Sequence, residues 1–309
     1  MKTRAVLCSL LIAGSTAWAL PLGSSARTVI PSDVQQIISV DYRALKNSNT
    51  AMALKQQVLP ESLKQFEAAL KGIGIDPDKD VDQLTFASYR SKKNVRVVGV
   101  AQGEFSLKSV LGKMRLRKIK PVKYRTAELY PMAGGMQMSF LEQDTLLFGD
   151  MDALKDALDA RDGYALTMDS NGQIVDMIGA VDSGTVWSVL DQQGTQNMMR
   201  SALGDASKLG DFETIKKRLL GSQYTMNFSN GVDFDLDVVT SDSVTAATLS
   251  SLVRAGMLYR KMNATATEKV ALDNVTVDSS SSNLQFHFKT DDKQFQSLLH
   301  SDLFAAVSR

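Results

Sequence analysis

The sequence has 309 residues, of which 44% are hydrophobic and 22% charged, a composition typical of a folded globular protein. Its 35 Lys and Arg residues balance 34 Asp and Glu residues, so the basic excess expected of a dedicated nucleic-acid binder is missing. The single cysteine, Cys8, excludes intramolecular disulfides and thiolate chemistry from the rest of the chain.

The N-terminus has the pattern of a secretion signal. Lys2 and Arg4 precede an apolar run over residues 5–13, and Ala17-Trp18-Ala19 match the small-x-small pattern that a signal peptidase recognises. We therefore expect residues 1–19 to be a signal peptide that is cleaved near Ala19, and the mature chain to be periplasmic or secreted. The apolar run is too short to cross about 30 Å of hydrocarbon, so no transmembrane helix is expected.

After a flexible leader over residues 20–31, hydrophobic periodicity and turn signals predict eight elements in the first half. In chain order they are a strand (34–42), a helix broken at Pro60 (49–70), a strand hairpin (83–89 and 95–101), a helix (105–114), two further strands (122–130 and 136–148) and a helix capped by Asp150 (150–160).

The second half has the same succession of predicted elements. These are a strand (185–190), a helix broken at Gly210 (195–220), a hairpin across Ser229-Asn230-Gly231 (223–228 and 232–239), a helix with Ser243 as N-cap (243–262), two strands (270–277 and 284–288) and a last helix (292–307).

Matching elements lie roughly 140 residues apart, which indicates an internal repeat. We expect a first α+β repeat over residues 32–163 and a second over residues 164–309. The predicted fold class is α+β, with two similar lobes, each an antiparallel sheet with helices packed on one face (tandem β-α-β-β-α-β-β-α units).

Several short strings carry a resemblance to a known group of proteins. They are GIGIDPDKDVDQLTFASY (72–89), VVGVAQGEFSLKSVL (97–111), YRTAELY (124–130), MSFLEQDTLLFGDMDALKDALD (138–159) and SGTVWSVLD (183–191). In this order they resemble a group of uncharacterised secreted bacterial two-repeat α+β proteins with no established activity. The resemblance implies an α+β fold and a location outside the cytoplasm, and it implies no active residues.

The sequence contains no motif that names a reaction. There are two histidines, His287 and His300, and neither lies in an H-E-x-x-H pattern; a G-x-S-x-G elbow and a phosphate-binding glycine loop are also missing. Because Phe286 and Phe288 flank His287 on a predicted strand, its side chain is expected to face the opposite side, toward solvent. No catalytic residue, cofactor or metal site is therefore predicted.

Asp76, Asp78, Asp80 and Asp82 alternate like the start of a calcium loop. An EF-hand requires Gly at the sixth and Glu at the twelfth position, where this chain has Val81 and Ala87. We therefore expect an acidic turn and cap that leads into the strand at Leu84.

The most unusual segment is a run of eight cations without an acid over residues 108–125. Residues 20–131 carry 19 basic and 10 acidic side chains, whereas residues 132–309 carry 14 and 24, so the acids of the second half could neutralise this run. The alternative is an external anionic partner, either an envelope component or an acidic protein. The predicted contact residues are Lys113, Arg115, Arg117, Lys118, Lys120, Lys123 and Arg125.

The expected function is that of a non-enzymatic extracytoplasmic envelope protein that binds a macromolecular partner or supports an assembly. Nucleic acid is not expected as the partner, because the basic run lacks interleaved aromatic residues. The alternative is a carrier of a lipid or other apolar ligand held between sheet and helices. A continuous apolar cavity favours the carrier, and a filled core with a charged face favours the binding protein.

Overall fold

The structure is a computed structural model that describes residues 21–58, 61–92, 94–203, 212–262 and 264–299. The expected signal peptide, residues 1–19, lies outside the described residues, as do Gly210 and the end of the last predicted helix.

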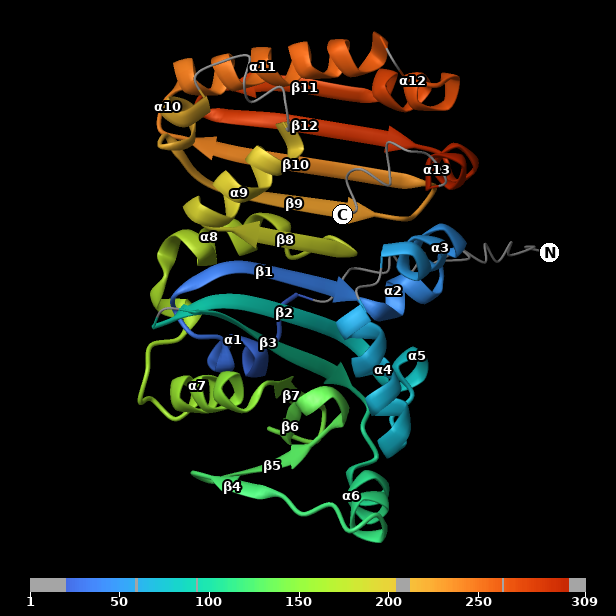
Figure 1. Cartoon of the computed structure of the whole chain (residues 1–309), viewed down its shortest axis with the longest axis vertical. Coiled ribbons are helices and arrows are strands. Elements are labelled where there is room, and N and C mark those ends of the chain that lie inside the picture. Colours follow the sequence, from blue (N-terminus) through green and yellow to red (C-terminus); the bar gives the residue numbers. More distant parts are fainter. Residues whose placement is uncertain (1–20, 59–60, 93, 204–211, 263, 300–309) are drawn as a thin grey trace, which may run out of the picture.

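The described strands pair antiparallel in one sheet of order β11-β12-β10-β9-β8-β1-β2-β3-β7-β6-β5-β4 (Figure 1). Their bounds are β1 (Val34–Asp41), β2 (Val81–Ser91), β3 (Asn94–Gly103), β4 (Val122–Tyr124), β5 (Ala127–Pro131), β6 (Gln137–Phe140), β7 (Thr145–Gly149), β8 (Val186–Leu190), β9 (Leu219–Asn227), β10 (Val232–Thr240), β11 (Val275–Ser280) and β12 (Asn283–Thr290).

The two halves of the chain arrange their strands in the same order. In the first half β1 is followed across the sheet by β2, β3, β7 and β6, and in the second half β8 is followed by β9, β10, β12 and β11. The halves meet where β1 pairs with β8, with Ile38 opposite Ser188. The predicted α+β class with antiparallel sheets is confirmed, and the two sheets are joined edge to edge into one. The shared strand order is what the predicted repeat requires, and the repeat itself stays a prediction.

The helices are α1 (Ser24–Val29), α2 (Tyr42–Lys46), α3 (Asn49–Val58), α4 (Glu61–Ile73), α5 (Pro77–Asp80), α6 (Leu107–Leu116), α7 (Met151–Arg161), α8 (Gly172–Val181), α9 (Gln192–Leu203), α10 (Phe212–Lys216), α11 (Ser243–Met262), α12 (Ala266–Asp273) and α13 (Asp292–Leu299), with 3-10 turns η1 (Ala133–Gly135) and η2 (Met168–Ser170). None of the described helices is long and apolar enough to cross a membrane.

Helices pack mainly on one face of the second half-sheet, as expected, but on both faces of the first, where one face was expected. Successive strand residues point to opposite faces. On β7, Leu147 packs with α1, α7 and α8, whereas Leu146 and Phe148 pack with α4 and α6. In the second half, α9, α10 and α11 pack against Val238 and Leu284, which share one face of the sheet.

The structure of residues 21–31 differs from the flexible leader that was expected there. Residues 24–29 form α1, and Ala26, Val29 and Ile30 are fully buried beside α7 and α8. Together with Leu22 they recur at helical spacing, so this short segment has an apolar stripe that packs into the core.

Other boundaries also differ, and the predicted strand over 136–148 is split into β6 and β7. The predicted strand over 122–130 is split into β4 and β5 by a turn in which Arg125 has a φ of +51°. Residues 270–273 end α12 instead of starting a strand, because a capping box between Thr265 and Glu268 starts this helix. The cap of α11 is Asp242, whose carboxylate accepts from the Thr245 N–H at 2.8 Å, and not Ser243.

Candidate functional site

The centre of the predicted basic stretch is the C-terminal end of α6. There the N–H of Ile119 donates to the Met114 carbonyl at 3.0 Å, and Lys118 has a φ of +59°, as in a Schellman turn. Ile119 packs on the apolar cluster beneath α6. This contact fixes the turn while Leu116, Arg117 and Lys118 remain exposed.

We call the group formed by Lys113, Arg115, Leu116, Arg117, Lys118 and Lys120 the basic tip. All six side chains are exposed, and Leu116 is 86% exposed. Among the described residues, no carboxylate forms an ion pair with any of its five cations. The tip lies at the end of the molecule that carries α6 and β4, opposite the end that carries α11 and α12 (Figure 1).

The two remaining predicted contact residues differ from the tip. Arg125 donates to Asp159 of α7 at 2.5 Å, and its guanidinium lies 3.5 Å from the centre of the Tyr164 ring. Burial raises the pKa of Asp159, but the hydrogen bonds from Arg125 and Tyr124 outweigh it and leave that pKa lowered. Lys123 is exposed and lies opposite Glu128 in the β4–β5 register. Arg125 is therefore neutralised within the chain.

Two cations of the preceding β2–β3 hairpin, Arg90 and Arg96, are also neutralised within the chain. Arg90 donates to Asp33 at 2.8 Å and also contacts Asp191. Arg96 binds Asp150 at 3.0 Å and Asp152 at 2.8 Å, at the start of α7. The acids of the later part of the chain thus reach the hairpin, but the described ones do not reach the basic tip.

The acidic segment over residues 76–82 is built around the short helix α5. Asp76 caps this helix by accepting from the Asp78 N–H at 3.2 Å, and Asp80 accepts from the Asp76 N–H at 2.7 Å. Asp78 pairs with Lys55 at 3.3 Å, and Asp82 accepts from the Nε of Arg43 at 3.0 Å. The segment is therefore a capped turn, as expected, although it is helical and not extended.

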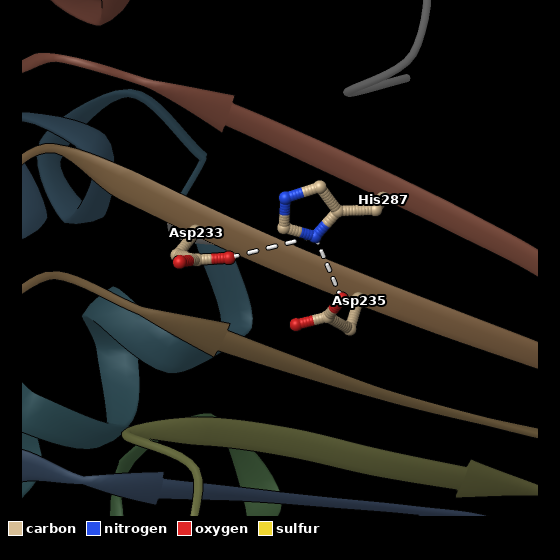
Figure 2. Close-up of side chains that lie close together, drawn as sticks. All are labelled: Asp233, Asp235 and His287. Carbon is tan, nitrogen blue, oxygen red and sulfur yellow. Dashed lines mark hydrogen bonds and ion pairs between the residues drawn. The ribbon is translucent and has the colours of Figure 1, made fainter. Parts of the chain in front are cut away.

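A second cluster was not predicted from the sequence. Asp233 and Asp235 on β10 and His287 on β12 point to the same face of the sheet (Figure 2). His287 Nδ1 lies 2.7 Å from Asp235 Oδ1 and 3.7 Å from Asp233 Oδ1. Asp233 Oδ2 accepts from Lys289 Nζ at 2.7 Å. His287 does face away from Phe286 and Phe288, but only the strand register shows which acids it meets.

Solved structures similar to this chain include two that belong to one protein. Both are crystal forms of the protein TP0453, described as form I and form IV. They match with TM-scores of 0.47 and 0.46 at 10% and 9% sequence identity, and cover 92% of this chain and 97% of theirs. No protein-family model matches the sequence, and no curated protein matches it.

Proposed function

We propose that this chain is a non-enzymatic extracytoplasmic protein that binds an anionic lipid surface through the basic tip. The observation that carries the proposal is the exposed side chain of Leu116, in a segment that carries five exposed cations with no described ion-pair partner. The extracytoplasmic location rests on the predicted signal peptide.

The electrostatic part of the proposal follows from the crowding of like charges. Cations this close repel one another, and that repulsion is relieved when an anionic surface approaches. Each Lys or Arg near an anionic membrane contributes about 1 kcal/mol. Lys113 and Arg115 also lie in the last turn of α6, where the helix dipole favours cations, whereas Lys118 and Lys120 lie beyond it.

Leu116 favours a lipid surface over an acidic polymer or protein tail. Transfer of a leucine side chain out of water contributes about 1.5–3 kcal/mol, but only if the partner has an apolar interior. A lipid surface offers headgroup charge to the cations and acyl chains to Leu116 at the same time. An acidic polymer contacts the cations alone.

The alternative function is that of a carrier of an apolar ligand. Two hollows in the surface give this alternative little support. One hollow, of about 560 Å³, lies between α11 and β11 and is lined mainly by serine and threonine. A second hollow, of about 230 Å³, lies between α12 and α13 and has a mixed lining. Both are open to the solvent and neither is a continuous apolar cavity.

The test is co-sedimentation of the mature protein with phosphatidylglycerol-containing vesicles and with neutral phosphatidylcholine vesicles. The first variant replaces Arg115, Arg117, Lys118 and Lys120 by Gln. A matched control replaces Lys217, Arg260, Lys269 and Lys293, which are exposed cations of the second half, also by Gln. Both variants change the net charge equally, so a difference between them reports the position of the cations.

We expect wild type and the control variant to bind anionic vesicles and the basic-tip variant to lose most of this binding. Equal loss in both variants would show that only net charge matters. Equal binding of the basic-tip variant and wild type would contradict the proposal. A soluble polyanion that competes fully, with no effect of Leu116→Ser, would point to an acidic polymer instead.

A further inference from the structure

We propose that Asp233, Asp235 and His287 form a binding site for a divalent transition-metal ion of the zinc type. The site lies on the face of the second half-sheet opposite α9, α10 and α11, in the half that does not carry the basic tip. The proposal is therefore independent of the lipid-binding function.

The geometry already places three ligand atoms around one point (Figure 2). His287 Nδ1 and one carboxylate oxygen from each aspartate all lie within 4.8 Å of one another. In a tetrahedral zinc site with bonds near 2.1 Å, neighbouring ligand atoms are about 3.4 Å apart. The observed separations from Nδ1, 2.7 and 3.7 Å, lie on either side of that value. Both separations from Nδ1 are therefore within about 1 Å of the value that a tetrahedral site requires.

One of these oxygens lacks a hydrogen-bond partner. Asp233 Oδ1 is closed off from solvent and accepts no hydrogen bond, although Oδ2 of the same carboxylate is held by Lys289. A carboxylate oxygen that has lost its water without gaining a donor carries a desolvation cost. A cation between Asp233 and His287 supplies the missing partner, and this is the observation that distinguishes the cluster from an ordinary row of surface charges.

The ligands stand on a rigid frame. β10 and β12 pair without a shift from Val232 opposite Thr290 to Val239 opposite Asn283; Asp235 and His287 lie opposite each other in the middle of this ladder, and Asp233 lies in the pair next to its end. Sites on paired strands hold their geometry better than sites on loops. Since His287 and Asp235 are partly or fully exposed, water can complete the coordination.

The ligand types select the metal. Imidazole nitrogen suits zinc, copper and nickel, whereas magnesium and calcium prefer sets made of oxygen alone. With one nitrogen and two carboxylates, the cluster fits zinc better than calcium. We therefore expect zinc to bind and millimolar calcium not to displace it.

The experiment is calorimetric titration of the mature protein with Zn²⁺ at neutral pH. Wild type is expected to bind one ion at this site, and His287→Gln and Asp235→Asn should each weaken binding at least about tenfold, because even second-shell changes typically cost 10–100-fold. Asp237→Asn is the matched control, because it removes one charge from the same strand and face. His300→Gln controls for the other histidine of the chain. Both controls should bind as wild type does.

Three outcomes would overturn the proposal. They are no saturable zinc binding by wild type, undiminished binding by His287→Gln, or equal weakening by Asp237→Asn, which would show diffuse charge attraction. A melting temperature that rises with zinc in wild type but not in His287→Gln would support it. The melting temperatures without zinc check that the variants are folded.

Discussion

Arg125 of the β4–β5 turn is held by Asp159 of α7 at 2.5 Å, within the same basic segment whose tip has no described ion-pair partner. This pair links the edge of the sheet to the helix that packs behind it, and the ring of Tyr164 covers the guanidinium. Within the basic segment, Arg125 therefore stabilises the fold, whereas the cations of the basic tip are available to a partner.

This division predicts opposite effects of two charge removals. Arg125→Gln should lower the melting temperature, because Asp159 loses its charged partner, and should leave binding to anionic vesicles nearly unchanged. The substitutions Arg115, Arg117, Lys118 and Lys120 to Gln should leave the melting temperature unchanged or slightly raise it, because self-repulsion falls. Thermal denaturation followed by circular dichroism measures both. A large loss of stability in the second variant would mean that the tip is structural.

Vesicle binding measured over a range of salt concentrations should separate the contribution of the tip cations from that of Leu116. The Debye length falls from about 10 Å at 0.1 M to about 3 Å at 1 M ionic strength, so the attraction of the tip cations should weaken steeply. Leu116→Ser should reduce binding at every salt concentration and leave the salt slope unchanged, because it removes apolar contact and no charge. Co-sedimentation over a salt series measures both slopes. A changed slope in Leu116→Ser would mean that its side chain positions the cations.

Alkaline pH should remove a stabilising contribution of Tyr130. Burial, and then the hydrogen bond to Glu128 at 2.5 Å, raise the pKa of Tyr130 from 10.0 to about 12. A raised pKa means that the fold favours the neutral phenol. Its contribution is therefore complete below pH 10 and is lost as the pH rises through about 12. The difference in unfolding free energy between wild type and Tyr130→Phe should shrink over this interval, as urea denaturation can measure. A constant difference would contradict the raised pKa.

Much of the fold could be predicted because local patterns determine it. The apolar spacing before and after Pro60 predicts α3 and α4, and Ser229-Asn230-Gly231 predicts the β9–β10 hairpin that the structure contains. The join between β1 and β8 could not be predicted in this way. It pairs residues about 150 positions apart, and neither strand has a local signal for its neighbour.

The same reason explains why one site was predicted and the other was not. The basic tip is contiguous in sequence, so counting charges finds it, although counting does not show that Asp159 neutralises Arg125. The cluster of Asp233, Asp235 and His287 depends on the β10–β12 register, which places His287 opposite Asp235. The alternation of acidic and apolar residues in Asp233-Phe234-Asp235, which lies opposite His287-Phe288-Lys289, was a visible signal, but only a predicted pairing of the two strands would have made it useful.

Because the sheet continues across the β1–β8 pair, we expect the two halves of the chain to unfold together. Trp187 on β8 is 1% exposed and packs in the cluster that also contains Ile37 of β1 and Val98 of β3. The other tryptophan, Trp18, lies in the expected signal peptide. The tryptophan fluorescence of the mature chain therefore reports only the surroundings of Trp187, where β1 and β8 pair. Unfolding followed by fluorescence and by far-ultraviolet circular dichroism should therefore give one midpoint.

The substitution Ile37→Ala leaves a cavity at a buried position of β1. It should lower the free energy of unfolding by about 2–5 kcal/mol and shift both midpoints equally. Two separate transitions, with only the fluorescence midpoint moved by Ile37→Ala, would show that each half is stable without the β1–β8 pair.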